Sequence, residues 1–148
     1  MSNETPVELP SSSLSLKEKL RQEIEGSGID PEIVRAVALR SKYLLETAEA
    51  SSELDRLRGE GSDVSGLRYR SCELNLQESI VRKGTADALV AIKFDPGDVE
   101  AAEVLVSEIK ARERERWSKE SKRGDGYPNY QSIVVLDCVV EATSRKKG

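Results

Sequence analysis

Residues 30–59, DPEIVRAVALRSKYLLETAEASSELDRLRG, decide the fold because they predict one uninterrupted amphipathic helix. Asp30 caps its first turn, and Pro31 at the first helical position loses no hydrogen bond. Apolar side chains recur at helical spacing and form one face: Ile33, Val34, Val37, Ala38, Leu44, Leu45 and Ala48. Two arginines complement the dipole of the last turn, and Gly59 ends the helix. At about 1.5 Å per residue the helix is roughly 42 Å long, more than a small globule needs.

A second long helix is predicted after the short polar loop at residues 60–66. It runs from Leu67 to Lys83 and ends at Gly84. Its apolar side chains form two sets: Tyr69, Cys72, Leu76 and Ile80 on one face, and Leu67, Leu74 and Val81 beside them. A short loop between two long amphipathic helices favours an antiparallel hairpin.

The rest of the chain predicts one mainly helical domain. The expected parts are a flexible arm at residues 1–14, a single domain at 15–143 and a basic tail at 144–148. Ser15 and Glu18 form a capping box for a short first helix, which a Gly-Ser-Gly run ends. Asp95 and Pro96 open a further, strongly charged helix that extends to about Arg123.

Residues 85–94 fit two secondary structures. The run ALVAIKF at 88–94 is either a short buried strand or another helical segment, and periodicity does not separate the two in a run this short. The alanine content and a possible cap at Thr85 favour the helix. A strand here would make the fold α+β.

Residues 132–143 predict a C-terminal β-strand, because their apolar and β-branched side chains recur in alternation. The residues expected to pair in an oligomer are Ile133, Val134, Val135, Leu136, Cys138, Val139 and Val140. Asp137, inside this apolar run, should either face solvent or meet a basic partner. A lone strand cannot satisfy its own backbone groups, so the prediction requires a partner strand from another subunit or from residues 85–94.

The residue inventory predicts neither a catalytic site nor a cofactor. The chain has no histidine, which excludes Ser-His-Asp and Cys-His catalysis and histidine-containing zinc sites. Cys72 and Cys138 are expected to be buried, reduced packing residues. No phosphate-binding glycine loop, membrane span or signal peptide is recognisable, and no small-molecule substrate is evident. We expect a cytoplasmic protein, in the host cytoplasm if it is viral.

Positive charge is concentrated near the C-terminus. Residues 1–100 carry 13 basic and 19 acidic side chains, and residues 101–148 carry 10 and 8. The alternating charges of the last long helix predict either a solvated helix end held by ion pairs or a phosphate-contacting edge anchored by the tryptophan. The candidate contacts to nucleic acid or a partner are Lys110, Arg112, Arg114, Arg116, Trp117, Lys119, Lys122, Arg123, Arg145, Lys146 and Lys147.

Residues 33–92 resemble, in pattern, the small terminase subunits of tailed phages. The matching features are an amphipathic run ending LDRLRGEG at 54–61, a turn, and a second helix that begins LRY at 67–69. The resemblance implies a ring-forming protein that grips viral DNA. The chain lacks the helix-turn-helix and the basic N-terminus usual in that family, so no individual binding residue is carried over.

Three classes of function follow from the sequence. The favoured class is a non-enzymatic, oligomeric assembly or adaptor protein, with phage DNA packaging or virion morphogenesis as specific cases. The alternative is a small regulator of the anti-repressor or antitoxin type that binds a protein or nucleic acid. An enzyme would need a carboxylate-based site that the sequence does not reveal.

Overall fold

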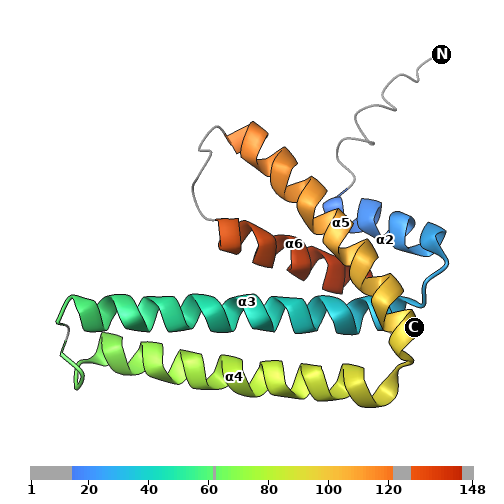
Figure 1. The fold of residues 1–148 in the computed structure, drawn as a ribbon. Helices are drawn as coiled ribbons and strands as arrows, with labels where there is room; N and C mark the ends of the chain where they lie inside the picture. The colour runs from blue at the N-terminus through green and yellow to red at the C-terminus, as the bar shows by residue number, and fades with distance from the viewer. Residues whose placement is uncertain (1–14, 62, 122–127, 145–148) are drawn as a thin grey trace.

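The computed structural model describes residues 15–61, 63–121 and 128–144, without the side chains of 120–121 and 128–131. These residues form five helices (Figure 1): α2 Leu16–Ser27, α3 Pro31–Gly59, α4 Leu67–Lys93, α5 Pro96–Ser121 and α6 Pro128–Ala142. The mainly helical fold class is therefore confirmed. The predicted arm and the last four residues of the predicted basic tail lie outside the described residues.

Helices α3 and α4 form the predicted antiparallel hairpin (Figure 1). At its start, Asp30 Oδ1 accepts a hydrogen bond from the Glu32 N–H at 3.0 Å. Helix α4 is longer than predicted, because it continues through Gly84 to Lys93. Residues 85–93 are thus helical, and the alternative of a strand in this segment is wrong. A glycine costs a helix only about 1 kcal/mol relative to alanine, which is too little to end a helix that packs along a partner.

The short first helix is confirmed as α2. Ser15 Oγ accepts a hydrogen bond from the Glu18 N–H at 3.1 Å, which caps the first turn. Gly28 ends the helix with φ of 79°, a left-handed conformation that glycine adopts without a steric penalty. The charged helix is confirmed as α5, which crosses above α3 and α6 (Figure 1).

The predicted C-terminal strand is wrong, because its residues lie in helix α6. The seven residues expected to pair between subunits are consecutive parts of one helix: Ile133, Val134, Val135, Leu136, Cys138, Val139 and Val140. An apolar run fits a strand and a helix equally well. The buried positions Val135, Leu136, Val139 and Ala142 follow the helical spacing. A helix satisfies its own backbone groups, so the reason for a partner strand disappears.

Tertiary packing explains why α6 is helical despite its many valines. It packs against α3, α2 and α5, which cover it from several sides. A helix that is apolar around most of its circumference is stable when it is enclosed in this way. The preference of valine for strands is small by comparison, and burial overrides it.

The buried residues form two separate clusters. The larger cluster joins α6 to α2, α5, the first half of α3 and the end of α4. The smaller cluster, Leu54, Leu57 and Tyr69, lies at the loop end of the hairpin. Figure 1 shows this end of α3 and α4 extending beyond α6. The hairpin is therefore a two-helix arm that projects from a helical bundle.

Two adjacent valines distinguish the helix from the strand in solution. Val135 is fully buried, whereas Val134 is only partly buried. We expect Val135→Ala to lower the free energy of unfolding by about 2 kcal/mol, through lost apolar burial and a residual cavity. Val134→Ala should cost about half of that or less. Urea unfolding of both variants measures the difference, and a larger effect at Val134 would contradict the helical packing.

Candidate interaction surfaces

Two arginines of the predicted phosphate-contacting edge of α5 are paired with carboxylates among the described residues. The Arg112 guanidinium donates to both carboxylate oxygens of Glu23 on α2, at 3.1 and 2.8 Å. Arg112 also lies 3.2 Å from Glu113, and Arg116 contacts Glu113 at 2.5 Å. The Glu113 carboxylate is buried between these two arginines. Arg112 therefore joins α5 to α2, and the pair of Arg116 with Glu113 lies within α5.

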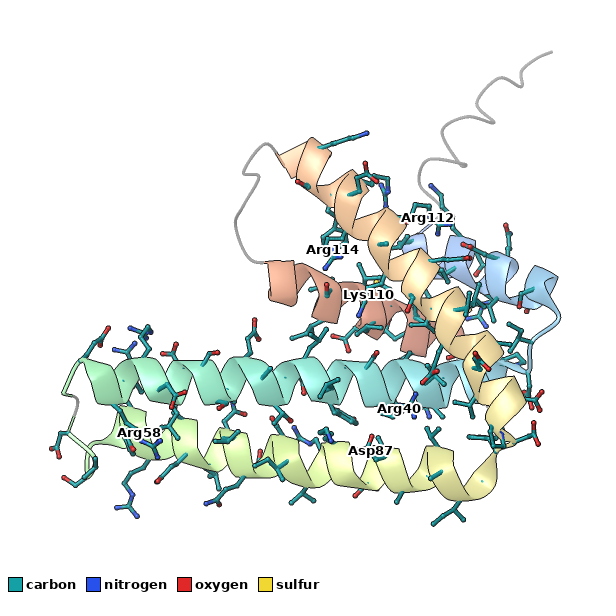
Figure 2. All side chains as sticks on the ribbon, in the orientation of Figure 1. Arg40, Arg58, Asp87, Lys110, Arg112 and Arg114 are labelled. Carbon is teal, nitrogen blue, oxygen red and sulfur yellow. The ribbon has the colours of Figure 1, made fainter. Side chains whose placement is uncertain are left out.

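Lys110 and Arg114 are arranged differently. Figure 2 shows both side chains pointing from α5 toward α6. Arg114 reaches the Ser132 hydroxyl at 3.5 Å, and the Lys110 amino group has no carboxylate within ion-pair distance among the described residues. Burial lowers the pKa of Lys110, and the positive charge of Arg114 lowers it further. Among the described side chains, neither Lys110 nor Arg114 has a carboxylate within ion-pair distance.

The remaining candidates do not complete a continuous basic surface in the described residues. Trp117 is partly buried, and Lys119 is exposed near the end of α5. Five candidates lie outside the described residues: Lys122, Arg123, Arg145, Lys146 and Lys147. The structure therefore brings together Lys110, Arg112, Arg114 and Arg116 on α5, and two of these four already hold carboxylates.

Asp137 has the basic partner that its position predicts. Its Oδ1 lies 2.7 Å from the Lys42 amino group, so the pair joins α6 to α3. Burial opposes the charge of Lys42, but the hydrogen bond and the charge of Asp137 prevail and raise the pKa of Lys42. Both side chains keep part of their surface in water. Asp137 is thus a structural residue of the α3–α6 contact.

Neither cysteine forms a disulfide, and the described residues hold no group of three cysteine or carboxylate side chains placed to bind a metal ion. Burial raises the pKa of the Cys138 thiol, and Glu141 and Asp137 add to the effect, which makes this thiol less reactive. No helix in the described part of the chain has the length and apolar character of a membrane span.

The least expected surface is on α4. Five apolar residues, the outer face of α4, point away from α3: Leu67, Leu74, Val81, Ala88 and Ile92. Leu67 is 84% exposed and Ile92 is 83% exposed, and the outer face runs the length of the helix. Contiguous apolar surface of this kind marks sites of association in soluble proteins.

Spacing explains how one helix carries two apolar faces. Tyr69, Leu76 and Val90, with the small residues between them, pack toward α3 at three- and four-residue intervals. Leu67, Leu74, Val81 and Ala88 repeat every seven residues, and this set begins two positions before the inward set that starts at Tyr69. Two positions correspond to about 200° around a helix, so the second set lies almost opposite the first.

The outer face of α4 has hollows between its side chains like those on a helix of a coiled coil. One shallow hollow on α4 is lined by Leu67, Arg70, Ser71, Leu74 and neighbouring polar residues. Four residues at positions i, i+3, i+4 and i+7 form the hole that receives one side chain of a partner helix in coiled coils. Small or polar residues between the large ones keep these holes open.

The seven-residue spacing in the sequence is the signal for this surface, but the same residues also fit a wider core. Leu67, Leu74 and Val81 were expected beside the inward face, and Ile80 on it, yet Ile80 is 52% exposed. The seven-residue spacing extends to Ala88 only when α4 continues past Gly84. A predicted end at Lys83 therefore excludes two of the five residues of the outer face, Ala88 and Ile92.

Comparison with protein-family models, with curated proteins and with solved structures finds no match for this chain. The surfaces described above are thus the basis for inferring what the protein does.

Two lysines with opposite surroundings make a matched test of the charge arrangement. Lys110→Met keeps the aliphatic stem and removes a partly desolvated charge next to Arg114. We expect it to raise the free energy of unfolding at pH 7 by a few tenths of a kcal/mol, a small value because solvent screens a partly exposed group. Lys42→Met breaks the contact with Asp137 and should lower the free energy of unfolding by about 0.5 kcal/mol.

The pH dependence has a definite sign. The pKa of Lys110 is lower in the folded chain than in the unfolded chain, where it has the ordinary lysine value of about 10.4. At pH values between these two pKa values, the unfolded chain therefore binds more protons than the folded chain. Across this pH window the free energy of unfolding of the wild type should rise relative to that of Lys110→Met. The difference between the two proteins should therefore become smaller. Chemical denaturation at a series of pH values measures it. A gap that widens with pH would show that Lys110 is stabilised by an acid.

Proposed function

We propose that this chain is a non-enzymatic assembly or adaptor protein that presents the outer face of α4 to a helix of its partner. The observation that carries the proposal is the row of exposed apolar residues at seven-residue spacing on a helix already packed on its other side. A helix needs only one apolar face to join its own bundle. The second face has no use inside the subunit as the described residues are arranged.

The length of the outer face supports a helical partner. From Leu67 to Ile92 it covers about 38 Å along the axis, or roughly seven turns. A partner helix can follow such a straight strip with one side chain in each hole, whereas a small ligand would occupy only one or two. The bundle of α2, α5 and α6 would then hold the arm in place.

The DNA-packaging interpretation receives less support than assembly itself. It needs free cations along α5, but Glu23 and Glu113 hold Arg112 and Arg116. The apolar face of α4 needs a protein and no phosphate. A small regulator that binds a protein would use the same surface, so the proposal rests on this face and not on the family resemblance.

A generic helix tests whether the outer face binds helices. The probe is a labelled synthetic peptide of three heptads with leucine at both core positions. Leu74→Lys with Val81→Lys should weaken its binding to the full chain by at least about tenfold. The reason is that burying one such side chain is worth about 1.5–3 kcal/mol, and 1.4 kcal/mol is a factor of ten. Fluorescence anisotropy at fixed salt measures the dissociation constant.

Val104→Lys is the matched control, because Val104 on α5 is 53% exposed, close to the 57% of Leu74. It should leave the affinity for the peptide unchanged. Circular dichroism establishes that all variants are folded. Equal binding to the double variant and to wild type would remove the outer face of α4 as an interaction site and overturn the proposal.

A further inference from the structure

We infer that the partner of the outer face of α4 is the same helix of a second copy, packed antiparallel across a two-fold axis between Ser79 and Ile80. This inference rests on the proposed function and names the occupant of that surface. It is argued from the sizes of the residues along α4, from the charges near its middle and from a glycine that the single subunit does not need.

Large and small residues are divided between the two halves of α4. The first half presents Leu67 and Leu74 on the outer face, and the second half presents Gly84, Ala88 and Ala91 around it, all of them exposed. An antiparallel pair lays the first half of one copy on the second half of the other. Large side chains then meet small ones around Leu74 and Gly84, the middle part of each half of the contact, as close packing requires.

The positions match in detail around this axis. Leu74 lies as far from the axis as Thr85, so Leu74 of one copy enters the hole formed by Val81, Gly84, Thr85 and Ala88 of the other. Leu67 and Ile92 are also equidistant from the axis, and each would close one end of the contact. Val81 of one copy lies near the axis and enters the hole between Leu74 and Gln77 of the other copy. A parallel pair would instead place Leu74 of one copy on Leu74 of the other. It would leave a void where Gly84 of one copy faces Gly84 of the other.

Gly84 is the most specific part of this argument. Glycine in the middle of a helix lowers stability relative to alanine. Within the subunit nothing requires it, because a Cβ atom at Gly84 would meet no atom within 4 Å. Its backbone conformation is also an ordinary helical one. The missing side chain leaves open space on the described surface of α4, and the Leu74 side chain of a second copy would fit there.

Charge favours the same direction. Glu78 and Arg82 lie on either side of the axis on the exposed surface, and within one helix they are 3.7 Å apart. In the antiparallel pair, Glu78 of each copy lies beside Arg82 of the other, so the two ion pairs extend across the contact. In a parallel pair, Glu78 faces Glu78 and Arg82 faces Arg82, and like charges oppose each other.

The size of the contact predicts a weak dimer. A strip about 40 Å long and about 10 Å wide buries roughly 400 Å² on each copy, or about 800 Å² in total. Stable interfaces bury about 1,200–2,000 Å². We therefore expect a monomer–dimer equilibrium in the micromolar range that is visible as protein concentration rises, instead of a permanent oligomer.

The experiment measures mass by sedimentation equilibrium over a wide concentration range for the full chain and two variants at one glycine. Gly84→Leu fills the hole, and it should weaken dimerisation by about tenfold or more while raising the thermal stability of the monomer. Gly84→Ala should change the dimer dissociation constant by less than about threefold. Because both substitutions favour the helix, loss of the dimer in Gly84→Leu cannot be caused by unfolding.

Direction is tested with single cysteines in a background that carries Cys72→Ala and Cys138→Ala and still shows the wild-type mass curve. Arg70→Cys and Ala88→Cys, mixed, should form a disulfide between copies, because these positions lie at nearly equal distances on opposite sides of the axis. Arg70→Cys alone should not, since its two copies would lie roughly 28 Å apart. A bond between two Arg70→Cys chains, or a dimer indifferent to Gly84→Leu, would overturn the antiparallel pairing.

The outcomes separate this inference from the proposed function. A chain that stays monomeric at every concentration, yet binds the leucine peptide through the outer face of α4, overturns the second copy as partner and leaves the adaptor proposal standing. A chain that neither dimerises nor binds the peptide overturns both. Dimerisation that Gly84→Leu abolishes, with the mixed disulfide, supports both.

Discussion

Burial of α6 is the constraint on which the rest of the bundle depends. This helix has Ile133, Val135, Leu136 and Val139 almost completely out of water, and among its described side chains only Glu141 is exposed. Covering such a helix requires neighbours on several sides, and α2, α3 and α5 supply them. The long reach of α5 across α3 and α6 follows from the same need (Figure 1). The first half of α3 is thereby committed to the bundle, and only its second half is left to pair with α4 alone.

Ion pairs then fix the covering helices around α6. Lys17 on α2 reaches Glu141, Lys42 on α3 reaches Asp137, and Arg40 on α3 contacts Glu103 on α5. Single exposed pairs contribute little to stability, because solvent screens them. Their common feature is that they join different helices, so they select one arrangement of a bundle whose larger buried cluster contains no aromatic side chain among its described, fully buried members. Arg112 of α5 belongs to this set through Glu23 on α2, so part of the alternating charge of α5 serves the bundle.

Local signals in the sequence determined the hairpin and the helix starts. Asp30 with Pro31, Ser15 with Glu18, and the Gly-Ser-Gly run each act within one turn, so they can be read without knowledge of the tertiary structure. The strand at 132–143 could not be judged in this way, because its valines are compatible with both periods and the surrounding helices decide between them. Leu44 shows that apolar spacing alone does not decide burial: it follows the spacing of α3 but is 51% exposed, since no helix of the described residues covers it.

The two apolar faces of α4 have different consequences for the molecule. The face toward α3 is mixed with serine, lysine and alanine, and it buries few large side chains beyond Tyr69. The outer face carries larger aliphatic residues and leaves them in water. A chain with 34% charged residues has no shortage of polar side chains for an exposed helix, so retaining leucine and valine there has a cost in solubility. That cost is offset only when the outer face is covered, and the two-helix arm, which extends beyond the bundle, is the part of the fold that a partner can reach without disturbing α6.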